Sequence, residues 1–522
     1  MVASFAANMA PWMFGSLVVF LLIGFPVSFS LGACGLFYAL VGIELGLMPA
    51  SLMQALPLRI VGIMQNDTLL AIPFFTFMGL ILERSGMAED LLDTIGQLFG
   101  PIRGGLAYAV IFVGAMLAAT TGVVAASVIS MGLISLPIML RHGYDRRVAS
   151  GVIAASGTLA QIIPPSLVLI VLADQLGQSV GALYQGALMP ALVLTGLYGV
   201  YVGVISVLRP QWVPAMPASA RALFRASPDS GWRPRAQLCV QVAVVLIPPL
   251  ALIFLVLGTI FLGIATPTEG GAMGATGALV IALARRRLDL PQLRQAMQST
   301  ARLSCFVLFI LIGSTVFSLA FQAVDGPKWV EHLLAGLPGG VLGFLIVVNL
   351  LVFLLAFFLD FFELAFIVVP LLSPVAAALG IDMVWFGVLL AVNMQTSFMH
   401  PPFGFALFYL RSVAPDREYT DAVTGQRIAP VSIGQIYRGA IPFVLIQLAM
   451  VALIIAFPGL VSRGPDAATS IDPDAVLRQL QSEQNAADAA SKPTKPDENA
   501  VDEDPMKALQ KAVEAEREAT PK

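Results

Sequence analysis

The chain has 522 residues, of which 58% are hydrophobic and only 12% are charged, whereas a soluble domain carries about 25% charged residues. This composition excludes an ordinary soluble enzyme, and a mean hydropathy of +0.86 indicates that most of the chain lies in lipid. The formal net charge is −3, and the Lys and Arg residues are scattered between apolar runs, which argues against a nucleic-acid partner. We therefore expect an all-α polytopic membrane protein in the lipid bilayer.

Ten apolar stretches are suited to crossing a bilayer, which takes about 20 residues of helix. They lie near residues 12–30, 31–47, 68–82, 148–172, 187–208, 237–257, 258–284, 303–323, 383–410 and 440–462. Two more, 104–140 and 341–378, are too long for one crossing, and polar residues interrupt each near its middle. We predict that both are re-entrant helical hairpins, whose irregular tips are covered by protein or line a wet cavity.

The arginines predict the orientation of these spans. Arg103, the cluster at 141–147, the Arg-rich linker at 209–236 and the cluster at 285–287 fall on one side, which is the cytoplasm by the positive-inside rule. The hairpins then enter from opposite faces. Both chain ends lie outside, unless the first two spans are one broken helix, in which case the N-terminus lies inside.

An internal repeat divides the chain into two halves. A shift of 237 positions superposes Pro137, Gly143, Asp145 and Pro164-Pro165 on Pro374, Gly380, Asp382 and Pro401-Pro402, and a shift of 239 superposes Gly24, Gly32 and Gly35 on Gly263, Gly271 and Gly274. Chance coincidence of Gly and Pro is the alternative. Five crossings per half is an odd number, so the second half is inserted upside down, as in secondary transporters. We predict inverted repeats at 1–208 and 237–463, followed by an acidic, disordered tail at 464–522.

Polar residues in the middle of the membrane are candidates for the functional site. They occur at the two hairpin tips and in two spans that are broken by a Pro-Pro pair. The first half contributes Thr120, Thr121, Gly122, Ser156, Gly157, Thr158, Pro164 and Pro165, and the second half contributes Asp360, Glu363, Asn393, Gln395, Thr396, Ser397, Pro401 and Pro402. Each Pro-Pro pair leaves carbonyls without helical partners, at positions 160 and 161 and at 397 and 398. Hard oxygens of this kind suit a small cation.

Each of these motifs also has a structural interpretation. Ser and Thr hydroxyls can bond back within their own helix, and a Pro-Pro pair can be a simple kink. Glu269, in a polar break between apolar runs, either supports the local fold or lines a cavity. His400 either caps a broken helix or responds to protons. The three histidines lie far apart and no metalloprotease, NTPase or serine-hydrolase motif is present, so we expect no catalytic residues, no cofactor and no metal other than sodium.

At these residues the sequence resembles the large membrane subunit of the tripartite ATP-independent periplasmic (TRAP) transporters, over roughly residues 10 to 460. The resemblance rests on short motifs: 70–75 with Gly79, 143–145, 162–166, 265–269 and 396–404. It implies an inverted-repeat, elevator-type, sodium-coupled symporter for organic acid anions. It also implies two partners: a small four-helix membrane subunit, and a soluble periplasmic protein that delivers the substrate.

The resemblance also implies roles for particular residues. One sodium site would use Thr120, Thr121 and Gly122 with Ser156 to Thr158, and a second would use Asp360 with Asn393 to Ser397. Pro164, Pro165, Glu269, Glu363, His400, Pro401 and Pro402 would serve the substrate or the gate. The chain departs from many relatives in two places: no carboxylate follows the first tip at 124–127, and His400 stands where Thr is frequent.

We therefore expect a sodium-driven importer of a small organic acid, such as a dicarboxylate or a 2-oxo acid, in the bacterial inner membrane. A self-sufficient ion-coupled carboxylate symporter is the first alternative, and a membrane-embedded enzyme or scaffold is the second.

Overall fold

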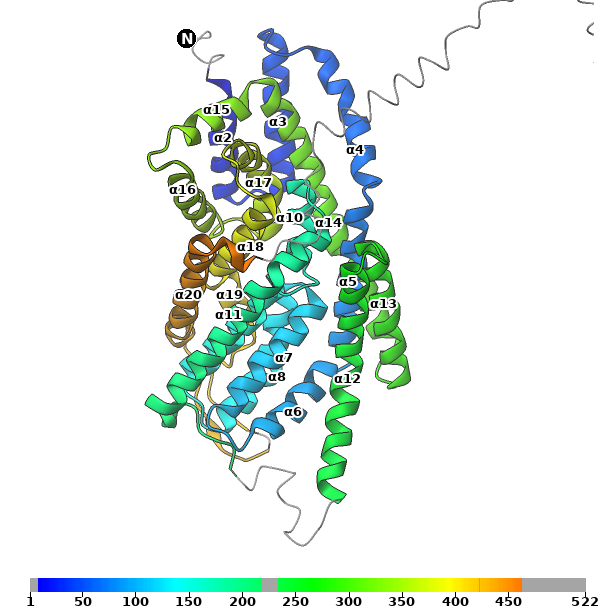
Figure 1. The fold of residues 1–522 in the computed structure, drawn as a ribbon, viewed down its shortest axis with the longest axis vertical. Helices are drawn as coiled ribbons and strands as arrows, with labels where there is room; N and C mark the ends of the chain where they lie inside the picture. The colour runs from blue at the N-terminus through cyan, green and yellow to red at the C-terminus, as the bar shows by residue number, and fades with distance from the viewer. Residues whose placement is uncertain (1–7, 218–232, 422, 462–522) are drawn as a thin grey trace, which may run out of the picture. The chain divides into compact units, whose positions relative to one another are not determined.

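The computed structural model describes residues 8–217, 233–421 and 423–461 (Figure 1). The predicted tail at 464–522 and the middle of the predicted linker, 218–232, lie outside the described residues. Within the described ranges the regular structure is helical, apart from one two-stranded hairpin. An all-α membrane fold is therefore confirmed.

The first half of the chain forms α-helices α2 to α11 with three short 3₁₀ segments. Their bounds are α2 (Met9–Ile23), α3 (Val27–Glu44), η1 (Ala50–Ala55), α4 (Leu56–Met64), α5 (Asp67–Arg84), α6 (Met87–Phe99), α7 (Gly105–Thr121), α8 (Val124–Arg141), α9 (Arg146–Thr158), η2 (Leu159–Gln161), α10 (Leu167–Leu176), α11 (Val180–Leu208) and η3 (Pro210–Trp212).

The second half forms α12 to α20, and a small β-hairpin lies before the last long helix. The bounds are α12 (Arg233–Phe261), α13 (Pro267–Ala284), α14 (Leu290–Ala323), α15 (Gly326–Ala335), α16 (Gly340–Leu355), α17 (Phe361–Ala378), α18 (Met383–Met399), α19 (Phe405–Val413), β1 (Tyr419–Thr420), β2 (Arg427–Ile428), α20 (Ile433–Ala456) and η6 (Pro458–Leu460).

The helices differ from the predicted spans in number and in length. Seven described helices are long and apolar enough to cross a membrane, or eight if the bent pair of α4 and α5 counts as one span. The predicted spans 148–172 and 383–410 are each divided into two shorter helices by the Pro-Pro break, which lowers the number. The helix that contains the predicted span 303–323 starts earlier, at Leu290, because Asp289 and Gln292 form a capping box there.

The two halves repeat the same local structure at a separation of 237 positions. Helix α8 covers 124–141 and α17 covers 361–378, so both ends of these helices correspond. Helices α9 and α18 also start at corresponding residues, after N-caps from Asp145 and Asp382. The glycines before these caps, Gly143 and Gly380, both have positive φ, at 79° and 71°, where a side chain would strain the backbone.

The halves also pack on each other reciprocally (Figure 1). Helix α3 packs on α14, and α13 packs on α5. A Cβ atom on Gly35 would lie 2.8 Å from the Phe317 backbone, and one on Gly274 would lie 2.6 Å from Met78 Sδ. In the repeat, Gly35 corresponds to Gly274 and Met78 corresponds to Phe317, each 239 positions later. Such exchange of partners is what a two-fold axis generates, and it agrees with the inverted-repeat fold.

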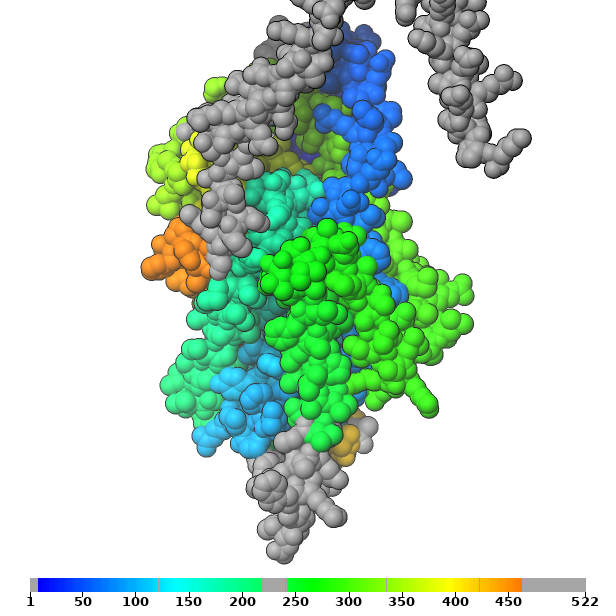
Figure 2. Space-filling view, turned by 45° about the vertical axis from the view of Figure 1, so that its right-hand side comes forward, coloured from blue at the N-terminus to red at the C-terminus, as the bar shows by residue number. Residues whose placement is uncertain are grey.

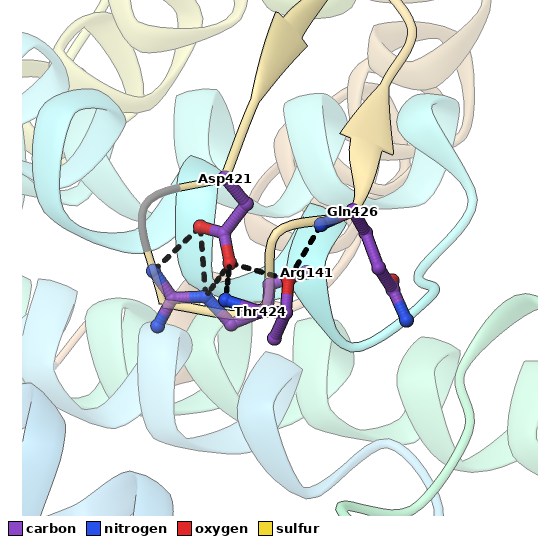
Figure 3. A network of polar contacts seen from close by, with 4 residues as sticks. All are labelled: Arg141, Asp421, Thr424 and Gln426. Atoms are coloured by element: carbon purple, nitrogen blue, oxygen red, sulfur yellow. Dashed lines mark hydrogen bonds and ion pairs between the residues drawn. The ribbon is translucent and has the colours of Figure 1, made fainter.

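An ion pair holds the β-hairpin against the end of α8 (Figure 3). Arg141 Nη2 lies 2.9 Å from Asp421 Oδ1, and Thr424 donates to Asp421 Oδ2 from its backbone N–H at 2.8 Å and its hydroxyl at 2.6 Å. The Asp421 side chain is only 4% exposed. Its hydrogen bonds, first with Arg141 and then with Thr424, hold the pKa of this carboxyl well below its ordinary value.

Helices α12 and α13 form part of the surface of the molecule, in green in Figure 2. Ile247, Phe254 and Leu255 are exposed on α12, as are Val280 and Leu283 on α13. An apolar face of this extent is suited to lipid or to another membrane helix rather than to water.

Candidate functional site

The first hairpin breaks beside the first Pro-Pro pair. Helix α7 ends at Thr121, whose side chain lies outside what the structure describes, and Gly122 follows with φ +60°. A Cβ atom on Gly122 would lie 3.1 Å from Leu167 Cγ, so the hairpin tip contacts the first residue of α10. The Thr120 hydroxyl donates to the Leu117 carbonyl at 3.0 Å, which is the helical back-bond of the structural interpretation.

The end of α9 is wedged between the two arms of this hairpin. A Cβ atom on Gly114 of α7 would lie 2.5 Å from Ser156 Cβ, and one on Gly157 would lie 2.4 Å from Val128 Cγ2 of α8. Ser156, Gly157 and Thr158 are buried, and the Ser156 hydroxyl has no hydrogen-bond partner among the described residues. The structure therefore places Ser156 and Gly157 between the two arms of the first hairpin.

Ser166 forms hydrogen bonds with backbone groups on both sides of the first break. The Pro164-Pro165 peptide bond is cis. The Gln161 carbonyl, which was predicted to lack a helical partner, accepts a hydrogen bond from the Ser166 hydroxyl at 2.7 Å. Ser166 also caps α10 by accepting from the Val168 N–H at 3.2 Å. The side-chain Oε1 of Gln161 is buried without a partner within the described ranges.

The second break, on α18, shares the cis Pro-Pro bond with the first, but α19 after it has no side-chain cap. Asn393 donates to the Asn349 carbonyl of α16 at 2.7 Å, so α18 is tied to the second hairpin. Thr396 and Ser397 bond back to the carbonyls four residues earlier, at 2.9 Å and 3.2 Å. The Ser397 carbonyl accepts from the His400 N–H at 3.2 Å, and the Pro401-Pro402 bond is cis.

The second hairpin tip contacts this break through aromatic rings. The His400 imidazole stacks on Phe357 at 5.1 Å between centroids, and Phe357 lies in the break between α16 and α17. Asp360 and Glu363 form a capping box, with the Asp360 carboxylate accepting from the Glu363 N–H at 3.1 Å. Within the described ranges, no hydrogen bond joins Asp360 to residues 393–397.

Glu269 lies at the start of α13, where it closes a capping box with Thr266. Its carboxylate accepts from the Thr266 N–H at 2.8 Å, and the contact is exposed. This geometry is the structural alternative considered above. A role for Glu269 in gating stays a prediction.

The two broken helices meet directly. Gln395 Nε2 of α18 donates to Thr158 Oγ1 of α9 at 3.3 Å, and these residues lie 237 positions apart, at equivalent places in the repeat. Gln447 of α20 reaches the same hydroxyl at 3.5 Å and donates to the Tyr198 hydroxyl of α11 at 2.8 Å. All four side chains are fully buried. We call Thr158, Gln395, Gln447 and Tyr198 the axial cluster.

The sequence analysis missed Gln447, Tyr198 and Asn349. A signal for two of them was present, because Asn349 is the single amide of α16 and Gln447 lies among apolar residues in the C-terminal half of α20, and such residues are functional candidates in membranes. Tyr198 gave no signal, since tyrosine is common in apolar helices.

The candidate ion ligands around the first break and the axial cluster are uncharged oxygen atoms. Within the described ranges, no three His, Cys, Asp or Glu side chains gather as a metal site. Buried oxygens of Ser156, Gln161, Gln395 and Gln447 lack partners in the same part of the chain. Hydroxyl and amide oxygens are hard ligands, which suit an alkali or alkaline-earth cation better than a transition metal.

Two broken helices that meet on a two-fold axis, each beside a broken hairpin, define a secondary transporter with inverted repeats. The model of the tripartite ATP-independent periplasmic transporter family, DctM component, matches residues 14–460. The chain belongs to this family, as its large permease subunit. It is thus a multi-pass membrane protein and a component of a tripartite, ATP-independent transporter.

Relatives and a solved structure agree with this assignment. The C4-dicarboxylate TRAP transporter large permease protein of Pseudomonas aeruginosa is 29% identical over 78% of this chain and 88% of its own. That of Rhodobacter capsulatus is 28% identical over 86% and 96%. Both are named as permeases, not as enzymes. The crystal structure of the Alcanivorax borkumensis YdaH transporter matches in fold, with a TM-score of 0.55 and 16% identity, over 83% of this chain and 100% of its own.

Proposed function

We propose that this chain couples the entry of sodium to the import of a small organic acid anion, such as a dicarboxylate or a 2-oxo acid, across the bacterial inner membrane. The observation that carries the proposal is the meeting of two broken helices at Thr158 and Gln395, with a hairpin break beside each. The names of the C4-dicarboxylate relatives support the substrate class.

The two hairpin breaks differ in charge, which supports binding of the anion in the first half and of a sodium ion in the second. Val123 and Asp360 are equivalent N-cap residues, 237 positions apart. Val123 itself gives the α8 N-terminus no side-chain cap, and the positive pole of a helix N-terminus favours an anion. At the α17 N-terminus, Asp360 and Glu363 supply carboxylates, which favour a cation. We assign the anion to the first break, with Pro164 and Pro165, and one sodium ion to Asp360 with Asn393, Gln395, Thr396 and Ser397.

A second sodium ion would use oxygens of the first half: Thr120, Thr121, Gly122, Ser156, Gly157 and Thr158. The buried, unpartnered Ser156 hydroxyl supports this assignment. In the elevator mechanism, hairpins and broken helices move together past a fixed scaffold, with His400, Pro401 and Pro402 at the second gate. The coupled cation screens the charge of the anion during the crossing, when Coulombic interactions are strong because the surroundings have a low dielectric constant.

The first experiment is thermal unfolding of the purified chain, titrated with sodium, potassium or choline chloride at constant ionic strength. A specific site predicts a saturable rise in Tm with sodium alone, by binding linkage. Identical curves in the three salts remove sodium from the proposal and favour proton coupling, through His400 or Glu269.

The partners are tested by uptake into proteoliposomes. We expect uptake to require the small four-helix subunit and the periplasmic substrate-binding protein. Uptake by this chain alone favours the self-sufficient symporter instead.

A further inference from the structure

Hydrogen bonds of the axial cluster join the two halves of the molecule. It takes Thr158 and Tyr198 from α9 and α11 of the first half, and Gln395 and Gln447 from α18 and α20 of the second. Residues related by a two-fold axis touch each other only near that axis, so the bond between Thr158 and Gln395 marks its position.

Hydrogen bonds join the four side chains of the axial cluster in one network. The Thr158 hydroxyl donates its proton to the Ala155 carbonyl at 2.8 Å, so its oxygen can only accept from the two amides. Gln395 and Gln447 therefore present Nε2 to Thr158, and Gln447 uses its second proton for Tyr198.

The surroundings of the cluster leave it little freedom to adjust. A Cβ atom on Gly151 of α9 would lie 2.2 Å from the Gly439 carbonyl oxygen of α20, so these helices touch backbone to backbone. The Tyr198 ring packs edge-on against Phe443 of α20 at 5.2 Å. The amides are fully buried, so a displacement of α9 near Thr158 would break bonds that are costly to lose, and α18 and α20 would be expected to follow it.

We infer that the axial cluster couples the two proposed sodium sites, so that sodium at one half raises the affinity of the other. The inference rests on the proposed function, in which Thr158 contributes its backbone carbonyl to one site and Gln395 contributes its unpartnered side-chain Oε1 to the other. Gln447 and Tyr198 ligate neither ion. They are positioning residues that hold the two ligands in register across the axis, and the coupling is reciprocal.

The experiment is equilibrium binding of radioactive sodium to the purified full chain. We expect a Hill coefficient above 1 for the natural sequence, approaching 2 if two sites are tightly coupled. Gln447→Leu keeps the size of the side chain but removes both amide bonds. It should lower the Hill coefficient to about 1 and raise the half-saturating sodium concentration several-fold.

Two further variants make the result decisive. Thr195→Val, on the same helix as Tyr198, removes only a back-bond to the Ala191 carbonyl and should bind sodium as the natural chain does. If Gln447→Leu fails to fold, Tyr198→Phe removes a single hydroxyl and should lower the Hill coefficient in the same direction.

The outcomes separate this inference from the proposed function. A natural chain that binds sodium with a Hill coefficient of 1 overturns the coupling and leaves sodium transport standing. A natural chain that binds no sodium overturns both. A Gln447→Leu variant with a lower Tm but an unchanged Hill coefficient shows that the cluster serves the fold alone, and this also overturns the coupling.

Discussion

Thr158 and Gln395 occupy the same position in the two halves of the chain and are hydrogen-bonded to each other, at 3.3 Å between Oγ1 and Nε2. Each also stands six residues before the first proline of its Pro-Pro pair. The two breaks are therefore placed symmetrically about one contact. Their chemistry is not symmetric, because only the second half carries carboxylates at its hairpin break.

That asymmetry predicts the effect of a carboxylate at Val123. Val123→Asp gives α8 the N-cap that α17 already has, which should leave the free energy of unfolding unchanged or raise it by about 1 kcal/mol. The same charge should abolish binding of the organic anion, because it occupies the positive pole. Val123→Ser supplies a neutral cap and should retain binding. The measurement is calorimetric titration with the anion; equal affinities of the two variants contradict the assignment of the anion to this break.

Asp360→Asn tests the two roles of Asp360 separately: the N-cap of α17 and the proposed sodium ligand. Asn is as good an N-cap as Asp, so Tm without sodium should be nearly unchanged. The half-saturating sodium concentration should rise by tenfold or more, about 1.4 kcal/mol of lost binding free energy. Asp382→Asn changes the equivalent type of cap on α18 and is the matched control. Unaltered sodium affinity in Asp360→Asn argues against a carboxylate ligand.

The Arg141–Asp421 pair predicts how stability depends on pH. The folded-state pKa of Asp421 is lowered, so its contribution is complete above its unfolded pKa of about 4 and is lost as the pH falls through the lower folded value. Asp421→Asn should therefore be less stable at pH 7, and its deficit should shrink as the pH falls below about 4.

Asp325→Asn is the control for this measurement. Asp325 pairs with Lys328 at 2.7 Å, but both side chains are more than two thirds exposed, at 71% and 72%, so loss of the pair should change stability little at any pH. Unfolding is followed by tryptophan fluorescence. A pH-independent deficit for Asp421→Asn means that the carboxylate is not what stabilises the hairpin.

The close approach of α9 and α20 predicts a steric effect at Gly439. A Cβ atom there would lie 2.1 Å from the Arg147 carbonyl oxygen, whereas one on Gly434 of the same helix would meet nothing within 4 Å. Gly439→Ala should lower the free energy of unfolding by about 1–3 kcal/mol. Gly434→Ala should be neutral or stabilise by up to about 1 kcal/mol. Equal Tm values for the two variants are inconsistent with this packing.

The sequence predicted the breaks of the site better than its contacts. Pro-Pro pairs and lone polar residues in apolar runs are local signals, so Ser156 to Thr158 and Asn393 to Ser397 could be found from the chain alone. The bond from Gln447 to Thr158 joins residues 289 positions apart, and no local pattern specifies such a pairing. Asp360 and Glu269, which the sequence analysis proposed as an ion ligand and a gate residue, each take part in a capping box. Their presence in these apolar segments therefore also has a structural reason.

The reciprocal glycine contacts have a consequence for how the protein is made. Gly35 has its packing partner at Phe317, and Met78 has its partner at Gly274. The helices synthesised first therefore remain without their final neighbours until most of the chain has entered the bilayer. Native contacts of such wide sequence separation make folding slow. The early helices must therefore persist as separate spans, shielded by lipid or by the insertion machinery, until the second half closes the structure.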